Sequence, residues 1–109
     1  MAYDEKLATR LRSALKRRRG IEEKKMFGGL AFLVDGKMCC GVIGKDLVLR
    51  LGEEGTVRAL GRAHTREMDF TGRSLKTMVY VAPGGYRRET DLRRWVGRAI
   101  EYVRSLPRN

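Results

Sequence analysis

The stretch from Lys25 to Leu51 constrains the fold most strongly, because it alternates apolar segments of strand length with short turn signals. Asp-Gly between β-type segments is typical of a hairpin, since a type I′ turn needs φ > 0 at both central residues. Asp35-Gly36 supplies the first turn and Gly44-Lys45-Asp46 the second. The sequence therefore predicts a three-stranded antiparallel meander, with strands over residues 24–34, 37–43 and 46–51.

Two adjacent glycines, Gly28 and Gly29, interrupt the first of these predicted strands. Paired glycines inside a strand usually mark a bulge, a bend or the close approach of another backbone. We therefore interpret residues 24–34 as one strand that is bent at the glycines. The alternative is a glycine-rich loop that cradles phosphate, but such a loop requires a following helix that the sequence does not indicate here.

Amphipathic patterns predict a helix at each end of the chain. Near the N-terminus, leucines recur at helical spacing after Asp4, a suitable N-cap, and the helix is expected to end near residue 18. Near the C-terminus, Thr90 is the expected N-cap of a longer helix. The apolar stripe of that helix consists of Leu92, Trp95, Val96, Ala99, Val103 and Leu106.

Between these helices, residues 52–62 are typical of a short helix, with Val57 and Leu60 as its apolar anchors. Residues 66–70 and 77–82 are typical of two further strands. The prediction is a single domain over residues 1–109 with a two-layer α+β fold, in the order helix, three strands, helix, two strands, helix. Its sheet is antiparallel, and its core is expected to contain Phe32, Leu49, Trp95 and Val96.

The net charge is +11, and most of it lies in the two terminal segments. Residues 1–19 carry +5, residues 20–86 carry +2 and residues 87–109 carry +4. An excess of this kind favours attraction to polyanions. The candidate polyanion-binding residues are the outer arginines of the terminal helices, Arg10, Arg17, Arg94 and Arg98. The alternative is that these arginines are solvated, or paired with the acids of the same segments, Glu5, Glu89, Asp91 and Glu101.

The residues that could carry chemistry do not form a catalytic or metal-binding set. Cys39 and Cys40 are neighbours on a predicted strand, so they suit neither a disulfide nor a zinc pair. We expect one buried thiol and one more exposed thiol, and redox sensing by the exposed thiol is the alternative. His64, the only histidine, lies in a polar segment and is expected to be solvated. No cofactor, no metal and no enzymatic activity are expected.

An apolar patch is expected on the sheet face opposite the core, formed by Ile43, Val48, Val79 and Val81. Patches of this sort tend to mark interfaces, and the sequence therefore favours a homodimer. No apolar segment reaches the roughly 18 residues that a membrane span needs, and the polar N-terminus does not resemble a signal peptide. We expect a cytoplasmic protein that does not insert into membranes.

Four motifs occur in order along the chain, and together they are more specific than any one of them. They are Met26-Phe27-Gly28-Gly29-Leu30-Ala31-Phe32, Met38-Cys39-Cys40-Gly41-Val42, Met68-Asp69-Phe70-Thr71-Gly72-Arg73 and Val79-Tyr80-Val81. This succession resembles the N-terminal domain family of the TfoX/Sxy competence regulators over essentially the whole chain. The resemblance implies a fold like that of secretion chaperones. It also implies structural roles for the motif residues Met26, Phe27, Gly28, Gly29, Asp69, Phe70 and Gly72.

The resemblance also implies a function. Full-length regulators of this family promote the expression of competence genes together with the cyclic-AMP receptor protein, and they carry a second, C-terminal domain. The present chain is expected to be a stand-alone N-terminal domain, and the family supplies no catalytic residues. We therefore expect a non-enzymatic interaction module that controls transcription through contacts with a protein partner, such as a transcription regulator. The alternative is a small basic protein that binds nucleic acid non-specifically.

Overall fold

The computed structural model describes residues 3–26, 28–70 and 73–107, and for residues 70, 73 and 74 it describes the backbone only. The described chain alternates helices and strands, beginning with a helix and ending with the longest one. The elements are α1 (Glu5–Leu15), β1 (Ile21–Met26), β2 (Gly29–Val34), β3 (Lys37–Ile43), β4 (Asp46–Arg50), α2 (Gly52–Leu60), β5 (Thr65–Phe70), β6 (Arg73–Val81), α3 (Pro83–Tyr86) and α4 (Glu89–Ser105).

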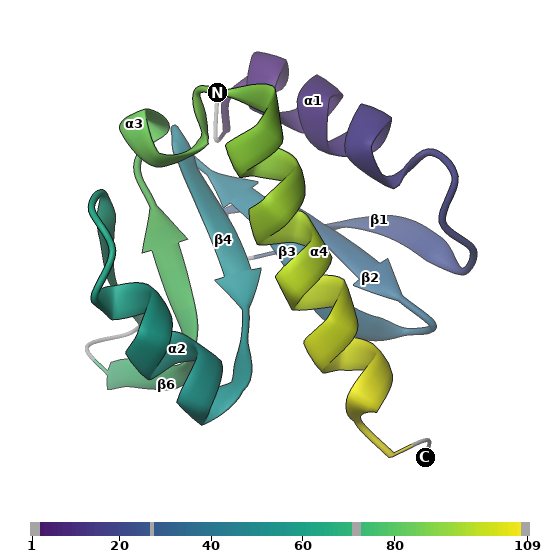
Figure 1. The fold of residues 1–109 in the computed structure, drawn as a ribbon. Coiled ribbons are helices and arrows are strands. Elements are labelled where there is room, and N and C mark those ends of the chain that lie inside the picture. Colours follow the sequence, from purple (N-terminus) through teal and green to yellow (C-terminus); the bar gives the residue numbers. More distant parts are fainter. Residues whose placement is uncertain (1–2, 27, 71–72, 108–109) are drawn as a thin grey trace.

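The strands form one six-stranded antiparallel sheet in the order β1-β2-β3-β4-β6-β5. Figure 1 shows α1, α2 and α4 on the same side of this sheet. The other face carries no helix of the described chain. The predicted two-layer α+β fold is therefore confirmed. None of the helices in the described ranges is long and apolar enough to cross a membrane.

The element order differs from the prediction at the glycine pair. Residues 24–34 are not one bent strand, because β1 and β2 are separate strands that pair antiparallel, from Ile21 opposite Val34 to Met26 opposite Gly29. Gly28 has φ +75°, a left-handed conformation that allows the chain to reverse direction there. Four strands therefore precede α2 instead of three, and the four-residue α3 is an additional element before α4.

Gly29 confirms the prediction that a backbone packs closely at this pair. A Cβ atom at Gly29 would overlap the carbonyl oxygen of Val42 on β3. Gly29 is itself buried in the sheet. Only glycine lets β2 and β3 approach as they do at this point.

The main core lies between the helices and the sheet. Phe32 of β2, Leu49 of β4, and Trp95 and Val96 of α4 are all buried in one apolar cluster, which confirms the predicted core. The indole Nε1 of Trp95 donates a hydrogen bond of 3.1 Å to the carbonyl of Gly85. The indole N–H is the only polar group of the Trp95 side chain, and it therefore has a hydrogen-bond partner.

The helix ends agree with the sequence at some positions and differ at others. Asp4 is the N-cap of α1, as predicted, and its side chain accepts hydrogen bonds from the backbone N–H groups of Lys6 and Leu7. The helix ends at Leu15, so residues 17–19 follow it instead of forming its last turn. The N-cap of α4 is Arg88 and not Thr90, which lies inside the helix.

The helix α2 is rotated relative to the prediction. Val57, an expected anchor, is 72% exposed. The buried positions are Gly52, Thr56 and Ala59, which recur at i, i+4 and i+7, and Leu60 packs partly against the main core. This stripe places the neighbouring position 58 toward solvent.

The sheet face away from the helices carries a second, smaller cluster, which we call the outer-face cluster. It has a buried centre and half-buried side chains packed against it, and its residues are Val48, Met68, Met78, Met38, Ile43, Leu75 and Tyr80. Ile43 and Val48 lie on this face as expected. Val79 and Val81 do not, because they pair with Leu49 and Leu47 and belong to the main core.

The two cysteines also differ from the prediction, because both are fully buried. Phe32 pairs with Cys40 and Leu33 pairs with Met38, so Cys39 is an extra residue in β3 at this point. Such a bulge interrupts the alternation of side chains, and both thiols enter the main core. A hydrogen bond with Cys39 and burial raise the pKa of the Cys40 thiol. The expected exposed thiol is therefore absent from this pair.

Candidate functional site

A groove of about 500 Å³ lies between α2 and α4 on the helix side of the molecule. Side chains from both helices and from the end of β4 line it. We call it the arginine groove, and its lining residues are Leu51, Gly55, Arg58, Arg62, Arg98, Glu101, Tyr102 and Ser105. A smaller hollow of about 190 Å³ shares Arg62 and Arg98 with the groove and adds His64, Arg94 and Trp95 among its lining residues. The two spaces therefore adjoin at Arg62 and Arg98.

Four arginines surround this space, and we call Arg58, Arg62, Arg94 and Arg98 the groove arginines. Arg94 and Arg98 are one helical turn apart on α4, and residues at i and i+4 lie on the same side of a helix. Arg58 lies in the last turn of α2, and Arg62 lies two residues beyond the end of that helix, where its backbone N–H bonds to the carbonyl of Ala59 at 2.9 Å. Guanidinium groups from α4, from α2 and from the residues just after α2 therefore gather around a common groove.

Trp95 positions two of these side chains. The guanidinium carbon of Arg98 lies 5.4 Å from the centroid of the Trp95 ring, and that of Arg62 lies 5.7 Å from it. Both distances are in the range of cation–π attraction. Because the indole is buried and hydrogen-bonded to Gly85, it is a fixed support for both cations.

The groove arginines are electrostatically unbalanced. None of them forms an ion pair with another residue of the described chain. Partial burial lowers the pKa of Arg98, and the positive charges of Arg62, Arg94 and Arg58 lower it further. The groove therefore holds several cations close enough to repel one another, and a bound anion would reduce that repulsion.

Four other arginines of the described chain form ion pairs, and they include Arg12 and Arg66. The Nε atom of Arg12 lies 2.8 Å from a carboxylate oxygen of Glu23, and an Nη atom of Arg66 lies 2.6 Å from one of Asp46. These pairs link α1 to β1 and β4 to β5. The contrast separates arginines that join elements of the fold by ion pairs from the groove arginines, which form no ion pair within the described chain.

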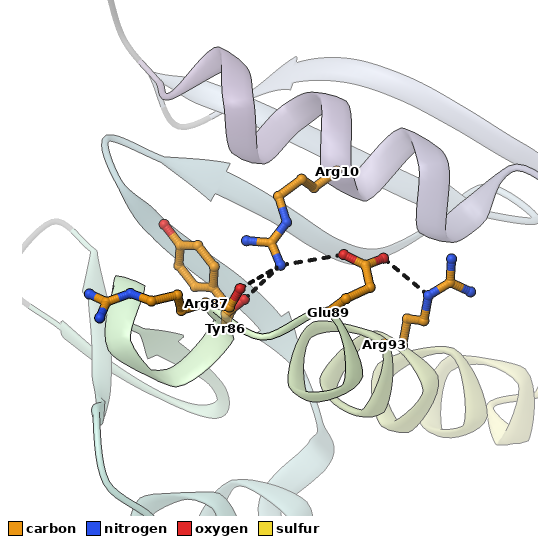
Figure 2. A network of polar contacts seen from close by, with 5 residues as sticks. All are labelled: Arg10, Tyr86, Arg87, Glu89 and Arg93. Atoms are coloured by element: carbon orange, nitrogen blue, oxygen red, sulfur yellow. Dashed lines mark hydrogen bonds and ion pairs between the residues drawn. The ribbon is translucent and has the colours of Figure 1, made fainter.

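Arg10, a candidate polyanion-binding residue, belongs to the first group. Figure 2 shows its guanidinium directed at the segment between α3 and α4. One Nη atom donates hydrogen bonds to the carbonyls of Tyr86 (2.9 Å) and Arg87 (3.1 Å) and lies 3.4 Å from a carboxylate oxygen of Glu89. Arg10 is therefore paired with Glu89, as the alternative interpretation of the sequence proposed, and it does not continue the positive charge of Arg94 and Arg98.

The remaining candidates lie apart from Arg10. Arg17 is exposed beyond the end of α1. Its neighbour Arg18 lines a shallow hollow along α4 together with Arg94, Arg98 and Arg104. Their role as polyanion-binding residues stays a prediction, but Arg94 and Arg98 are the two that the structure brings together.

Sequence reasoning missed Arg58 and Arg62. The available signal was their i, i+4 spacing in a predicted helix, opposite a stripe of small buried residues. The prediction of Val57 as a buried residue rotates the helix about its own axis. The two arginines are then not recognised as part of a binding site.

The structure places five of the family's motif residues, and their structural role stays a prediction. Met26 ends β1, Gly28 forms the chain reversal, and Gly29 lies against β3. Asp69 is exposed on β5, and the backbone of Phe70 ends that strand. Phe27 and Gly72 lie outside the described residues. His64 is exposed, as predicted, with φ +68°.

A search for groups of histidine, cysteine and acidic side chains that could hold a metal ion found none among the described residues. The chemistry that the arginine groove offers is binding of anions through charge and hydrogen bonds. Guanidinium groups suit this task, because each presents several N–H donors in a planar fork that matches phosphate or carboxylate oxygens.

Comparison with known proteins agrees with the fold. The family described as the TfoX N-terminal domain matches residues 13–103, nearly the whole chain. Searches of curated proteins and of solved structures each found no match. The matched range includes the four motifs, both faces of the sheet and the groove arginines. The chain therefore belongs to the family of TfoX N-terminal domains.

Proposed function

We propose that this chain is a non-enzymatic regulatory module that controls transcription through contacts with a partner protein. Membership of the TfoX N-terminal domain family supports the regulatory class. The observation that supports a contact with a partner protein is the outer-face cluster, which lies on the side of the sheet that no described helix covers. Its occupant is a protein that presents an apolar surface of its own.

The outer face is suited to a protein and not to a nucleic acid. Its half-buried side chains are aliphatic, thioether and aromatic, and methionine adapts readily to different partner surfaces. Two arginines at this face are already engaged: Arg66 pairs with Asp46 and lies over the Tyr80 ring at 4.5 Å, and Arg50 donates to the carbonyl of Met38 at 3.3 Å. Neither of these two is free to neutralise a phosphate.

The experiment compares the whole chain with two variants that make the same kind of change on opposite sides of the molecule. Ile43→Glu places a carboxylate on the outer face, and Val57→Glu places one at an exposed position of α2. Cross-linking and affinity capture from cells, followed by mass spectrometry, are expected to recover one partner with the wild type and with Val57→Glu. That partner is expected to be lost with Ile43→Glu, and so is the change in transcript levels that overproduction of the chain causes.

Two outcomes would contradict the proposal. Capture and transcript changes that survive Ile43→Glu would show that the outer face is not the contact surface. A stable dimer of the wild type that Ile43→Glu dissociates, without loss of any other partner, would assign this face to a second copy of the chain. Circular dichroism and thermal unfolding establish that both variants are folded before the comparison is made.

Non-specific binding of nucleic acid is a second candidate function, and a separate observation favours it. Arg18 and Arg104 extend the row of positive charge from Arg94 and Arg98 along the outer surface of α4. Duplex binding by such a row would weaken steeply with salt, with a log–log slope of about −0.9 for each phosphate contacted. Fluorescence anisotropy with a labelled duplex at about 50 mM salt tests it. Absence of binding at tens of micromolar protein would eliminate this candidate.

A further inference from the structure

We infer that the arginine groove binds a small ligand that carries two or three linked phosphate groups. This site lies on the helix side of the molecule, away from the outer-face cluster, so the inference goes beyond the proposed protein contact. Three features carry it: the unpaired charge, the fixed positions of the guanidinium groups and the concave shape of the space they surround.

The charge selects an anion with more than one negative group. Three arginines and one glutamate, Glu101, line the groove, and Arg94 reaches the adjoining hollow. The groove arginines form no ion pair within the described chain. A single monovalent anion would leave most of this positive charge uncompensated. Linked phosphates supply several charges within one compact group and match the bidentate geometry of guanidinium donors.

The positions of the guanidinium groups favour a bound ligand over a diffuse ion atmosphere. Arg98 of α4 and Arg62, two residues after α2, approach the same buried indole. Their cation–π contacts restrict the side chains before any ligand arrives, which lowers the entropy that binding would otherwise lose. The two cations are therefore held together for a ligand that touches both.

The walls of the groove restrict the kind of ligand that fits between them. The Tyr102 ring packs over Gly52, where a Cβ atom would overlap it, and so it forms a fixed apolar wall. The Ser105 hydroxyl donates to the carbonyl of Tyr102 at 2.6 Å, which leaves its oxygen available as an acceptor. A phosphate ester with an apolar or hydroxylated remainder would find a matching surface on both sides of the arginines.

The concave shape of the groove favours a small ligand over a nucleic acid duplex. Its volume of about 500 Å³ lies within the range of small-molecule sites, roughly 300–1,000 Å³. A duplex is a convex, rigid rod whose charges are spread along its axis, and it is best met by cations distributed along a surface. Arg58, Arg62 and Arg98 instead line one concave space.

The probe for the test is sodium tripolyphosphate, added to the whole chain and followed by isothermal titration calorimetry. We expect saturable binding with one site for each chain, and weaker binding for pyrophosphate and again for orthophosphate. Arg62→Gln is expected to weaken binding about tenfold or more, since it removes a charge-assisted hydrogen bond. Arg19→Gln removes the same charge from an exposed position before β1 and is expected to change the affinity less than about twofold.

Three other results would overturn the inference. Equal weakening by Arg62→Gln and Arg19→Gln would show a response to net charge alone. Absence of saturable binding would show that the groove does not hold phosphate. If a 20-base-pair duplex bound in the same buffer, lost its affinity with Arg62→Gln, and tripolyphosphate did not compete with it, the groove would serve nucleic acid. Arg62 is exposed, and thermal unfolding of the Arg62→Gln variant checks that its fold is intact.

Discussion

Arg10 and Glu89 connect the first helix to the start of the last one, with an Nη atom 3.4 Å from a carboxylate oxygen (Figure 2). The same Nη atom donates to the carbonyls of Tyr86 and Arg87, which lie at the end of α3 and just after it. A cation that satisfies two backbone carbonyls at a helix junction contributes more than a surface ion pair does. Arg10 therefore has a structural role, and its charge is not available to a distant polyanion.

We predict that Arg10→Ala lowers the free energy of unfolding by about 1–2 kcal/mol, because two carbonyls lose a charged donor. Arg93→Ala is the matched control. Arg93 bonds to the same Glu89 at 3.0 Å, but only as an exposed i, i+4 pair, so its loss is expected to cost at most about 0.5 kcal/mol. Urea denaturation of both variants measures the difference, and equal effects would contradict the structural role of Arg10.

Trp95 connects the main core with the arginine groove. Trp95→Ala is expected to lower the free energy of unfolding by about 3–5 kcal/mol, since it empties a large buried site. Val57→Ala, at a position 72% exposed, is expected to change it by less than about 0.5 kcal/mol. A cost below about 1 kcal/mol for Trp95→Ala would show that the indole is not part of the core.

Two glycines are expected to respond to alanine in opposite directions. Gly29→Ala would place a methyl group against the carbonyl oxygen of Val42, and we predict a loss of about 1–3 kcal/mol. Gly97 lies inside α4, and a methyl group added there would meet open space, so Gly97→Ala is expected to stabilise the chain by about 0.5–1 kcal/mol. Thermal unfolding of both variants tests the pair, and a neutral Gly29→Ala would contradict the close approach of β2 and β3.

The features that could be predicted from the sequence are those fixed by local chemistry. Asp35 and Gly36 adopt φ values of +52° and +81°, as the turn between β2 and β3 requires. The alternation of Leu47 and Leu49 in β4 is likewise a property of the strand itself. Each of these signals acts over a few residues, and no other part of the chain overrides it.

The features that were missed depend on contacts between distant segments. The alternation of residues in β6 does not indicate which face of the sheet Val79 and Val81 occupy. Only the pairing of β6 with β4 places them in the main core. The bulge that buries Cys39 depends on the register between β2 and β3. Recognition of the groove required the rotation of α2, which Thr56 and Ala59 set by packing against the core. The spacing of apolar residues within one segment does not determine how that segment pairs with, or packs against, another segment.

The pair of Arg12 and Glu23 predicts how stability depends on pH. The hydrogen bond from Arg12 lowers the pKa of Glu23 below its usual value near 4.5 in the folded chain. A carboxyl whose pKa is lower when folded contributes stability above its unfolded pKa, and this contribution disappears as the pH falls through the folded pKa. The contribution is therefore present at neutral pH and is lost in acid, below about pH 4.5.

Arg12→Ala is expected to remove this pH dependence from the unfolding curve. Both side chains are about 40% exposed, at 41% and 39%, so solvent screening limits the effect to about 0–1 kcal/mol at neutral pH. The difference in unfolding free energy between wild type and Arg12→Ala is expected to shrink between pH 7 and pH 3, because protonation of Glu23 breaks in the wild type the pair that the variant already lacks. A difference that stays constant over this range would show that the α1–β1 contact does not depend on the Glu23 charge.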